Sequence, residues 1–178
     1  MAESNVMTRR DMDDEQSDVM QLVGFKLGSE LFGVDILMVQ EIIRSAPITP
    51  VPNSPDFVDG VINLRGGIIP VVDLRRRLNV ATEDAAINKD WVVILEIEGR
   101  VTGFIVDRVT EVLKISENSI EAAPEIISAG LESQYVRGVC EIGDKLLVLL
   151  DFQRILLVEE VKHLQALEVE PVEEALAT

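Results

Sequence analysis

Apolar and polar residues alternate over many short stretches of this chain, which is the pattern of strands with one face buried in a core. The alternating stretches are residues 21–27, 31–36, 60–64, 68–72, 91–96, 102–106, 109–113 and both arms of 138–150. Residues 39–44 fit a strand or one helical turn equally well, and the proline-rich segment 46–55 fits an extended connection. Short strands with a turn roughly every ten residues predict a mainly β protein. Parallel α/β folds are disfavoured because no long helix separates the strands.

Helical signals are confined to three places. Ser54-Pro55-Asp56 has the form of an N-cap followed by proline, which predicts a short helical turn. Asp73 is placed to cap a short helix over residues 73–79. Apolar residues at helical spacing predict a C-terminal helix from residue 151 to residue 167.

One stretch of the pattern occurs twice. Residues 57–74 match residues 135–152 without a gap, and each apolar position in one copy meets an apolar position in the other. A repeat at fixed spacing indicates two structural units of one design, and the polar segment 80–89 is the predicted boundary between them. The copies differ at the turn, which reads Arg65-Gly66-Gly67 in the first and Gly143-Asp144-Lys145 in the second. Shared residues are expected to build the fold, so the unshared turn is the first place to look for function.

Arg65 is the most informative residue of that turn. The segment Arg65-Gly66-Gly67 is expected to be a three-residue hairpin loop, because its glycines can adopt positive φ. The neighbouring glycines leave the guanidinium with little steric cover. Such an arginine suits a carboxylate or the C-terminal carbonyls of a helix on a partner. A plain exposed turn residue is the alternative.

Composition and charge narrow the possible partners. Hydrophobic residues make up 47% of the 178 residues and aromatic residues 4%, so the core is expected to be mostly Val, Ile and Leu. The formal net charge of −16 disfavours nucleic acid, because phosphate binding needs clustered Lys and Arg. No apolar run approaches the ~20 residues of a membrane span. No secretory signal precedes the first strand, so we expect a cytoplasmic protein with no direct membrane insertion.

Both ends of the chain are acidic. Residues 1–18 lack periodicity and carry six acids against two arginines, which predicts a disordered lead-in. Residues 159–178 carry six acids against one lysine and are expected to form the helix end and an acidic tail. The predicted folded domain therefore spans residues 19–158.

Candidate catalytic residues are few. His163 is the single histidine and has no Cys or second His nearby, so it is interpreted as a solvated helix residue. Cys140 lacks a credible base and is interpreted as a small buried residue. Asp73 and Asp151 occupy matching strand ends, where capping is simpler than catalysis. Arg75-Arg76-Arg77 is expected to be a solvated helix face that pairs with local carboxylates. These patterns predict no enzyme activity, no metal and no cofactor.

The segment GVINLRGGIIPVVDL at residues 60–74 resembles the CheW family of chemotaxis coupling proteins, and its Asn-Leu-Arg-Gly motif is highly specific in this setting. Further matching segments follow in the expected order: FGVDILMVQEI at 32–42, ITPVPNSPDFV at 48–58, GFIVDRVTEVL at 103–113 and LVLLDFQRIL at 147–156. The resemblance implies two pseudo-symmetric, intertwined five-stranded β-barrels with a C-terminal helix. It also implies a non-enzymatic adaptor that links chemoreceptor cytoplasmic tips to the regulatory domain of the CheA histidine kinase in membrane-associated arrays.

The resemblance assigns residues to both partners. The receptor-facing residues are Val39, Glu41, Gly60 and Arg65. An apolar anchor with two charged groups suits a helical hairpin. The kinase-facing residues are Val23, Ile36, Val51 and Gly103, small or aliphatic groups suited to a dry contact between barrels. Core packing is an equally good account of each aliphatic residue.

A ligand-binding or nucleic-acid-binding β-barrel is the alternative from another functional class. The acidic charge and the lack of an aromatic platform disfavour it. The proteins that the chain captures from cytoplasm would separate the two hypotheses.

Overall fold

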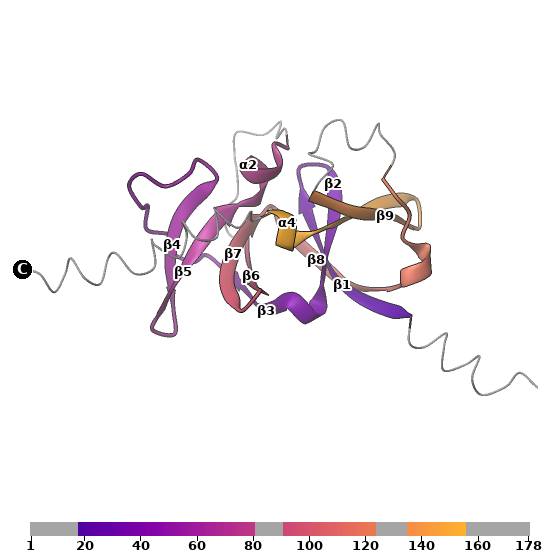
Figure 1. Ribbon diagram of the computed structural model, residues 1–178, viewed down its shortest axis with the longest axis horizontal. Helices are drawn as coiled ribbons and strands as arrows, with labels where there is room; N and C mark the ends of the chain where they lie inside the picture. Colours follow the sequence, from indigo (N-terminus) through magenta and orange to yellow (C-terminus); the bar gives the residue numbers. More distant parts are fainter. Residues whose placement is uncertain (1–17, 81–90, 124–134, 156–178) are drawn as a thin grey trace, which may run out of the picture.

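The structure is a computed structural model that describes residues 18–80, 91–123 and 135–155 (Figure 1). Its strands are β1 (Val19–Leu27), β2 (Glu30–Asp35), β3 (Val39–Arg44), β4 (Val58–Leu64), β5 (Gly67–Asp73), β6 (Trp91–Ile97), β7 (Arg100–Val106), β8 (Arg108–Ser116), β9 (Val136–Ile142) and β10 (Lys145–Leu150). The helices are short: the 3-10 helices η1 (Ile36–Met38) and η2 (Glu117–Ser119), and the α-helices α2 (Leu74–Leu78) and α4 (Phe152–Ile155). The chain is therefore mainly β, as predicted.

The strands form two five-stranded mixed sheets. Sheet I has the order β8-β1-β2-β10-β9, and sheet II has the order β3-β6-β7-β5-β4. Each sheet holds two hairpins joined by a parallel pairing, β2 with β10 in sheet I and β7 with β5 in sheet II. The fifth strand of each sheet is exchanged: β3 follows β1–β2 along the chain but pairs with β6, and β8 follows β6–β7 but pairs with β1. This exchange intertwines the two sheets.

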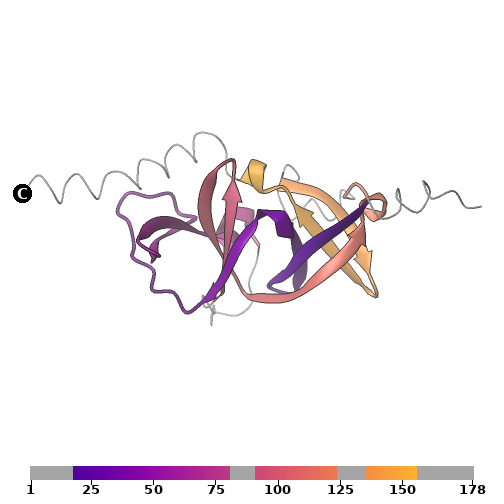
Figure 2. The same ribbon diagram turned by 90° about the horizontal axis from the view of Figure 1, so that it is seen from below.

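Three apolar clusters hold the sheets together. One lies within sheet I and includes Leu22 and Leu147, and a second lies within sheet II and includes Ile94 and Ile105. The largest cluster lies between the sheets and draws buried residues from both, as well as from α2 and α4. Each sheet is strongly curved (Figure 2), and each has an apolar cluster of its own. Cys140 belongs to the sheet I cluster and is buried, as predicted.

The two copies of the repeat each have a glycine, Gly60 or Gly138, at which another backbone segment crosses the strand. Thr49 forms an antiparallel bridge with β4, and Glu121 forms the matching bridge with β9. A Cβ on Gly60 would collide with the Thr49 carbonyl oxygen, and a Cβ on Gly138 would lie 2.8 Å from the Glu121 carbonyl oxygen. Both glycines therefore serve the same close approach of backbone to backbone.

A second echo joins the two exchanged strands. β3 reads VQEIIR, and β8 contains VTEVLK at residues 109–114. Val39 pairs with Leu95 and Val109 pairs with Phe25, and a register shift follows directly in both cases. Glu41 thus has a structural counterpart in Glu111. This echo was missed from the sequence, where its shared Val-x-Glu pattern is short.

Most predicted elements are confirmed, with two local corrections. Residues 39–44 form a strand, which decides between the two alternatives left open. Ser54-Pro55-Asp56 starts no helix, because the Val58 amide donates to the Pro55 carbonyl and closes a turn that leads into β4. The hairpin loop after Leu64 has two residues and not three, since Leu64 pairs with Gly67.

The two remaining helix predictions are tested to different extents. The Asp73 side chain accepts the Arg75 amide at 3.1 Å and caps α2, as predicted. The C-terminal helix begins at Phe152, and α4 is described as far as Ile155. Its predicted continuation to residue 167, the acidic ends and the boundary at 80–89 lie outside the described residues or at their edge.

Candidate functional site

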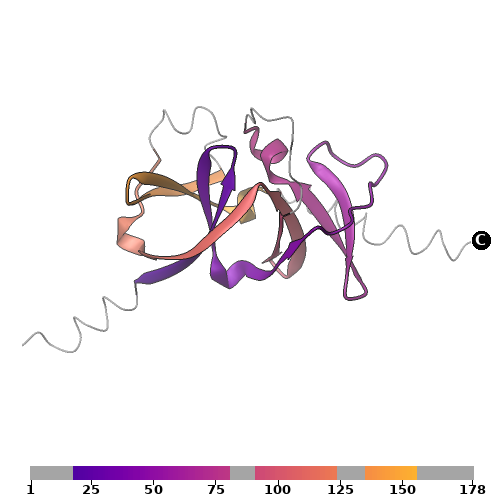
Figure 3. The same cartoon turned by 180° about the vertical axis from the view of Figure 1, so that it is seen from behind.

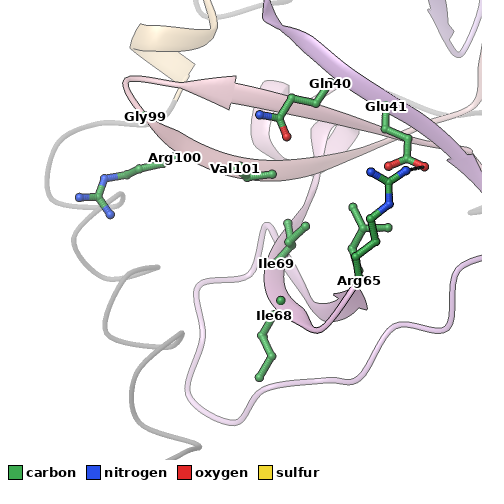
Figure 4. A pocket seen from close by; sticks show the side chains of 10 residues that line it. Gln40, Glu41, Arg65, Ile68, Ile69, Gly99, Arg100 and Val101 are labelled. Atoms are coloured by element: carbon green, nitrogen blue, oxygen red, sulfur yellow. Dashed lines mark hydrogen bonds and ion pairs between the residues drawn. The ribbon is translucent and has the colours of Figure 1, made fainter.

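A pocket of about 460 Å³ opens between the tips of hairpins β4–β5 and β6–β7 of sheet II (Figure 4). Its lining residues are Gln40 and Glu41 of β3, Leu64, Arg65, Gly67, Ile68 and Ile69 of β4–β5, and Gly99, Arg100 and Val101 of β6–β7. Aliphatic side chains form part of the wall, and polar side chains gather on the β3 side. We call this hollow the tip pocket.

The tip pocket brings together two of the predicted receptor-facing residues. Arg65 Nη2 lies 3.3 Å from Glu41 Oε1, although the two residues are 24 positions apart in the chain. The Arg65 side chain is 80% exposed and that of Glu41 is 30% exposed. Figure 4 shows the Arg65 side chain reaching toward Glu41, whereas Arg100 extends away from the pair. An exposed guanidinium held by a single carboxylate keeps donors facing solvent for a partner.

The turn that carries Arg65 is braced and strained. Arg65 has φ 51° and Gly66 has φ 83°, the signature of a type I′ turn. The Asn63 side-chain oxygen accepts the Gly66 amide at 3.1 Å. Each residue of the Asn-Leu-Arg-Gly motif thus has a place in the turn. Asn63 braces the turn, Leu64 lines the pocket, Arg65 is the exposed apex and Gly66 is the flexible second turn residue. A left-handed conformation at a residue other than glycine costs on the order of 1 kcal/mol.

The matching turn of the second copy avoids that strain. Gly143 has φ 59° and stands where the first copy has Arg65, and Asp144 has no positive φ. Glycine at the first central position is typical of a type II′ turn. The first copy therefore keeps an arginine at a position where the second copy has glycine, which adopts a positive φ without strain. Strain retained in this way is typical of functional positions.

The other two predicted receptor-facing residues, Val39 and Gly60, pack inside the fold. Val39 is half-buried in β3 and packs against the cluster between the sheets. Gly60 is buried at the opposite end of β4 from the tip pocket, where Thr49 crosses it. The structure thus joins Glu41 to Arg65 and leaves Gly60 away from them.

The predicted kinase-facing residues separate into two kinds. Val23 is 3% exposed in the cluster between the sheets, and a Cβ on Gly103 would lie 3.0 Å from Val92 within sheet II. Core packing accounts for both. Ile36 and Val51 are half-buried and pack against the cluster between the sheets, with part of each side chain accessible.

Leu37 is a surface residue that the sequence reasoning missed. Its side chain is 90% exposed on η1, next to Ile36. The Asp35 carboxylate accepts the Leu37 amide at 3.0 Å and fixes this turn. Single exposed apolar residues are common, but one held rigidly beside a half-buried Ile is suited to anchoring a contact. Nothing in the local pattern indicates its exposure, because that exposure depends on the crossing from β2 to β3.

The arginine run does not behave as one solvated face. Arg75 is 4% exposed, so the predicted solvated face was wrong for it, although its pairing with carboxylates is confirmed. Arg76 is half-exposed and pairs with Asp73 at 3.7 Å. The Arg77 guanidinium lies 4.8 Å from the ring centroids of both Phe57 and Tyr135, which are matching residues of the two copies. Arg77 therefore ties the two copies together.

Within residues 18–80, 91–123 and 135–155, no three His, Cys, Asp or Glu side chains lie close enough to hold a metal ion. None of the helices in the same ranges is long and apolar enough to cross a membrane.

Comparison with known proteins decides the family. The model of the CheW-like domain matches residues 21–160. The chain belongs to the CheW family. Its relatives include the chemotaxis protein CheW of Klebsiella aerogenes, 40% identical over 76% of this chain and 81% of that protein. The chemotaxis protein CheW of Treponema pallidum is 33% identical over 86% of this chain and 89% of its own length.

A solved CheW structure supports the same fold. The scaffolding protein TtCheW of Thermoanaerobacter tengcongensis is 36% identical, with a TM-score of 0.71 over 79% of this chain and 94% of that one. CheW-family scaffolds are non-enzymatic, which agrees with the lack of a catalytic constellation in the sequence. The CheW resemblance inferred from the Asn-Leu-Arg-Gly motif is thereby confirmed.

Proposed function

We propose that this CheW-family chain is a chemotaxis adaptor that links the cytoplasmic tip of a chemoreceptor to the regulatory domain of the CheA histidine kinase. The observation that carries the proposal is the strained, exposed Arg65 paired with Glu41 beside the tip pocket. The chain would act in the cytoplasm and be recruited to membrane-associated receptor arrays. Catalysis, metal and cofactor have no part in this function.

The receptor side of the proposal rests on the chemistry of the tip pocket. A receptor tip is a helical hairpin, and such a hairpin offers aliphatic side chains beside charged ones. Ile69 and Val101 provide aliphatic wall, and Arg65 provides a bidentate donor for a carboxylate. Glu41 holds Arg65 in place before binding, which lowers the ordering cost of the contact.

The kinase side rests on the aliphatic surface around η1. Leu37 is exposed, and Ile36 and Val51 are half-buried around the cluster between the sheets. Burial of aliphatic groups against a like surface of another domain depends little on salt. The two partners would use different side chains, Leu37 of η1 for the kinase and Arg65 with Glu41 for the receptor.

Substitution of Arg65 by Asn tests the receptor side. Asn-Gly is the preferred sequence of a type I′ turn, so Arg65→Asn keeps the turn and removes the guanidinium. We expect receptor control of kinase activity to weaken about thirtyfold, equivalent to about 2 kcal/mol, with no loss of thermal stability. Kinase activity is measured in a mixture of receptor-bearing vesicles, CheA and the variant chain.

The matched control is Arg137→Asn, which makes the same change of charge at an exposed residue of β9. It should leave receptor control unchanged. The direct affinity of Arg65→Asn for the isolated kinase domain should also equal that of the wild-type chain. Full receptor control in Arg65→Asn would remove Arg65 from the receptor site.

A further inference from the structure

An ionic network built around a buried arginine connects sheet II with sheet I. Arg75 of α2 is 4% exposed, and its Nη1 lies 2.6 Å from Asp107 Oδ1 while its Nε lies 3.3 Å from Asp73 Oδ1. The other oxygen of Asp107 accepts the Gly28 amide at 2.6 Å, and the Asp107 amide donates to the Lys26 carbonyl at 3.0 Å. The contacts therefore run from the end of β5 in sheet II to the β1–β2 turn of sheet I. Figures 1 and 3 show α2 facing that turn from opposite views.

The network exists at one junction of the repeat and not at the other. Gln153 stands in the second copy where the first has Arg75. Asp107 marks the crossing from β7 to β8, and the matching position at the crossing from β2 to β3 is Leu37. Leu37 is exposed and cannot accept a hydrogen bond from the opposite turn through its side chain. The repeated fold thus does not require the network, because the second junction is built without it.

The network is expected to contribute little to the free energy of unfolding and to serve mainly to fix the geometry of its contacts. A buried ion pair loses hydration that its mutual attraction only partly replaces, and apolar packing often stabilises a core equally well. The Arg75 guanidinium also leaves its Nη2 buried without a hydrogen-bond partner. A network with these costs is better explained by the directional contacts that it fixes.

We propose that Arg75 and Asp107 are positioning residues that hold the two sheets at one angle. Sheet II carries the tip pocket, and η1 crosses from β2 of sheet I to β3 of sheet II. Holding the sheets at one angle sets the course of η1 between them, and with it the kinase-facing surface relative to the receptor-facing side. The proposal rests on the adaptor function, because only a protein that engages two partners at once needs that relation to be fixed.

The test is the double variant Arg75→Gln with Asp107→Asn, which removes both charges and retains amide groups that hydrogen-bond. Spin labels are attached to cysteines that replace Lys114 of β8 and Glu96 of β6, both exposed, in a chain whose own Cys140 is replaced by Ala. The distance between the labels reports the distance between the sheets. We expect a broader distance distribution than in the wild-type chain. Receptor control of the kinase should fall at least about fivefold, with each separate affinity unchanged.

The matched control is Arg137→Gln with Asp144→Asn, an equal change of charge at exposed residues outside the network. It should leave the distance distribution and the receptor control as in the wild-type chain. An unchanged distribution in the Arg75 and Asp107 variant overturns the proposal. A broader distribution with full receptor control overturns its functional half.

A second variant keeps the proposal testable if the double variant unfolds. Asp107→Asn alone retains an acceptor for the Gly28 amide and removes only the charge that faces Arg75. Its distance distribution then decides by the same criterion. If wild-type chain fails to couple receptor and kinase, the adaptor function itself is wrong, and the distance measurement still reports on the network.

Discussion

Hairpins β4–β5 and β9–β10 are two copies of one design with different tips. Both carry a glycine that admits a crossing segment, Gly60 and Gly138, and both end in an aspartate whose amide donates to a matching carbonyl, from Asp73 to Phe57 and from Asp151 to Tyr135. Their tips differ, because Arg65 sits at φ 51° in one turn and Gly143 relieves the strain in the other. The comparison teaches that shared residues serve the fold, and that the two copies diverge at a turn where only one of them keeps a strained residue.

The largest expected effect concerns a residue that the copies share. Gly60→Ala and Gly138→Ala should each lower the free energy of unfolding by about 3 kcal/mol, because a Cβ has no room beside the crossing segment. Gly143→Ala is the control: no atom lies within 4 Å of its Cβ position, so only its φ of 59° resists the change. Urea denaturation measures all three. A stable Gly60→Ala chain that no longer binds receptor would return Gly60 to the receptor site.

The next largest effect is expected when one residue of η1 is replaced by its counterpart in the second unit. Leu37→Asp introduces the residue found at its counterpart, Asp107. We expect about tenfold weaker binding to the CheA regulatory domain, equivalent to about 1.4 kcal/mol, with stability changed by no more than about 0.5 kcal/mol. Calorimetric titration measures the affinity. Val19→Asp, at a residue that is 49% exposed at the start of β1, should have no effect on it.

Exchanging the two turn residues should shift stability in opposite directions. Arg65→Gly relieves a left-handed arginine, and Gly143→Arg creates one. We expect changes in the free energy of unfolding of about +1 and −1 kcal/mol respectively. Thermal unfolding of the two variants measures the difference. Equal melting temperatures would mean that the turn at Arg65 carries no strain.

The smallest effect separates Glu41 from its counterpart Glu111. Glu41 pairs with an arginine that is largely exposed, and such pairs contribute between 0 and about 1 kcal/mol. A double-mutant cycle of Arg65→Gln and Glu41→Gln should give a coupling near 0.5 kcal/mol that declines as salt is added. The same cycle with Glu111→Gln should give none. Coupling between Arg65 and Glu111 would show that the measured coupling does not come from the ion pair at the tip pocket.

Several features of the site were within reach of the sequence. The echo between residues 57–74 and 135–152 located Arg65, and the family resemblance added Glu41. Their ion pair was not predicted, because it depends on β3 crossing from the first hairpin into sheet II. Val23 and Gly103 were predicted to face the kinase, with core packing as an equal alternative, because an aliphatic or small residue gives no sign of which face it occupies.

The sequence by itself determined the strands, the repeat, the cap at Asp73 and the CheW resemblance, since each depends on residues close together in the chain or on a fixed spacing. Tertiary structure alone decided which strands were exchanged, which arginine was buried and which leucine was exposed. Arg75 and Arg76 are neighbours of one type, yet 4% of one side chain and 53% of the other is exposed. That difference arises because Asp107, brought from 32 residues away, meets one guanidinium and not the other.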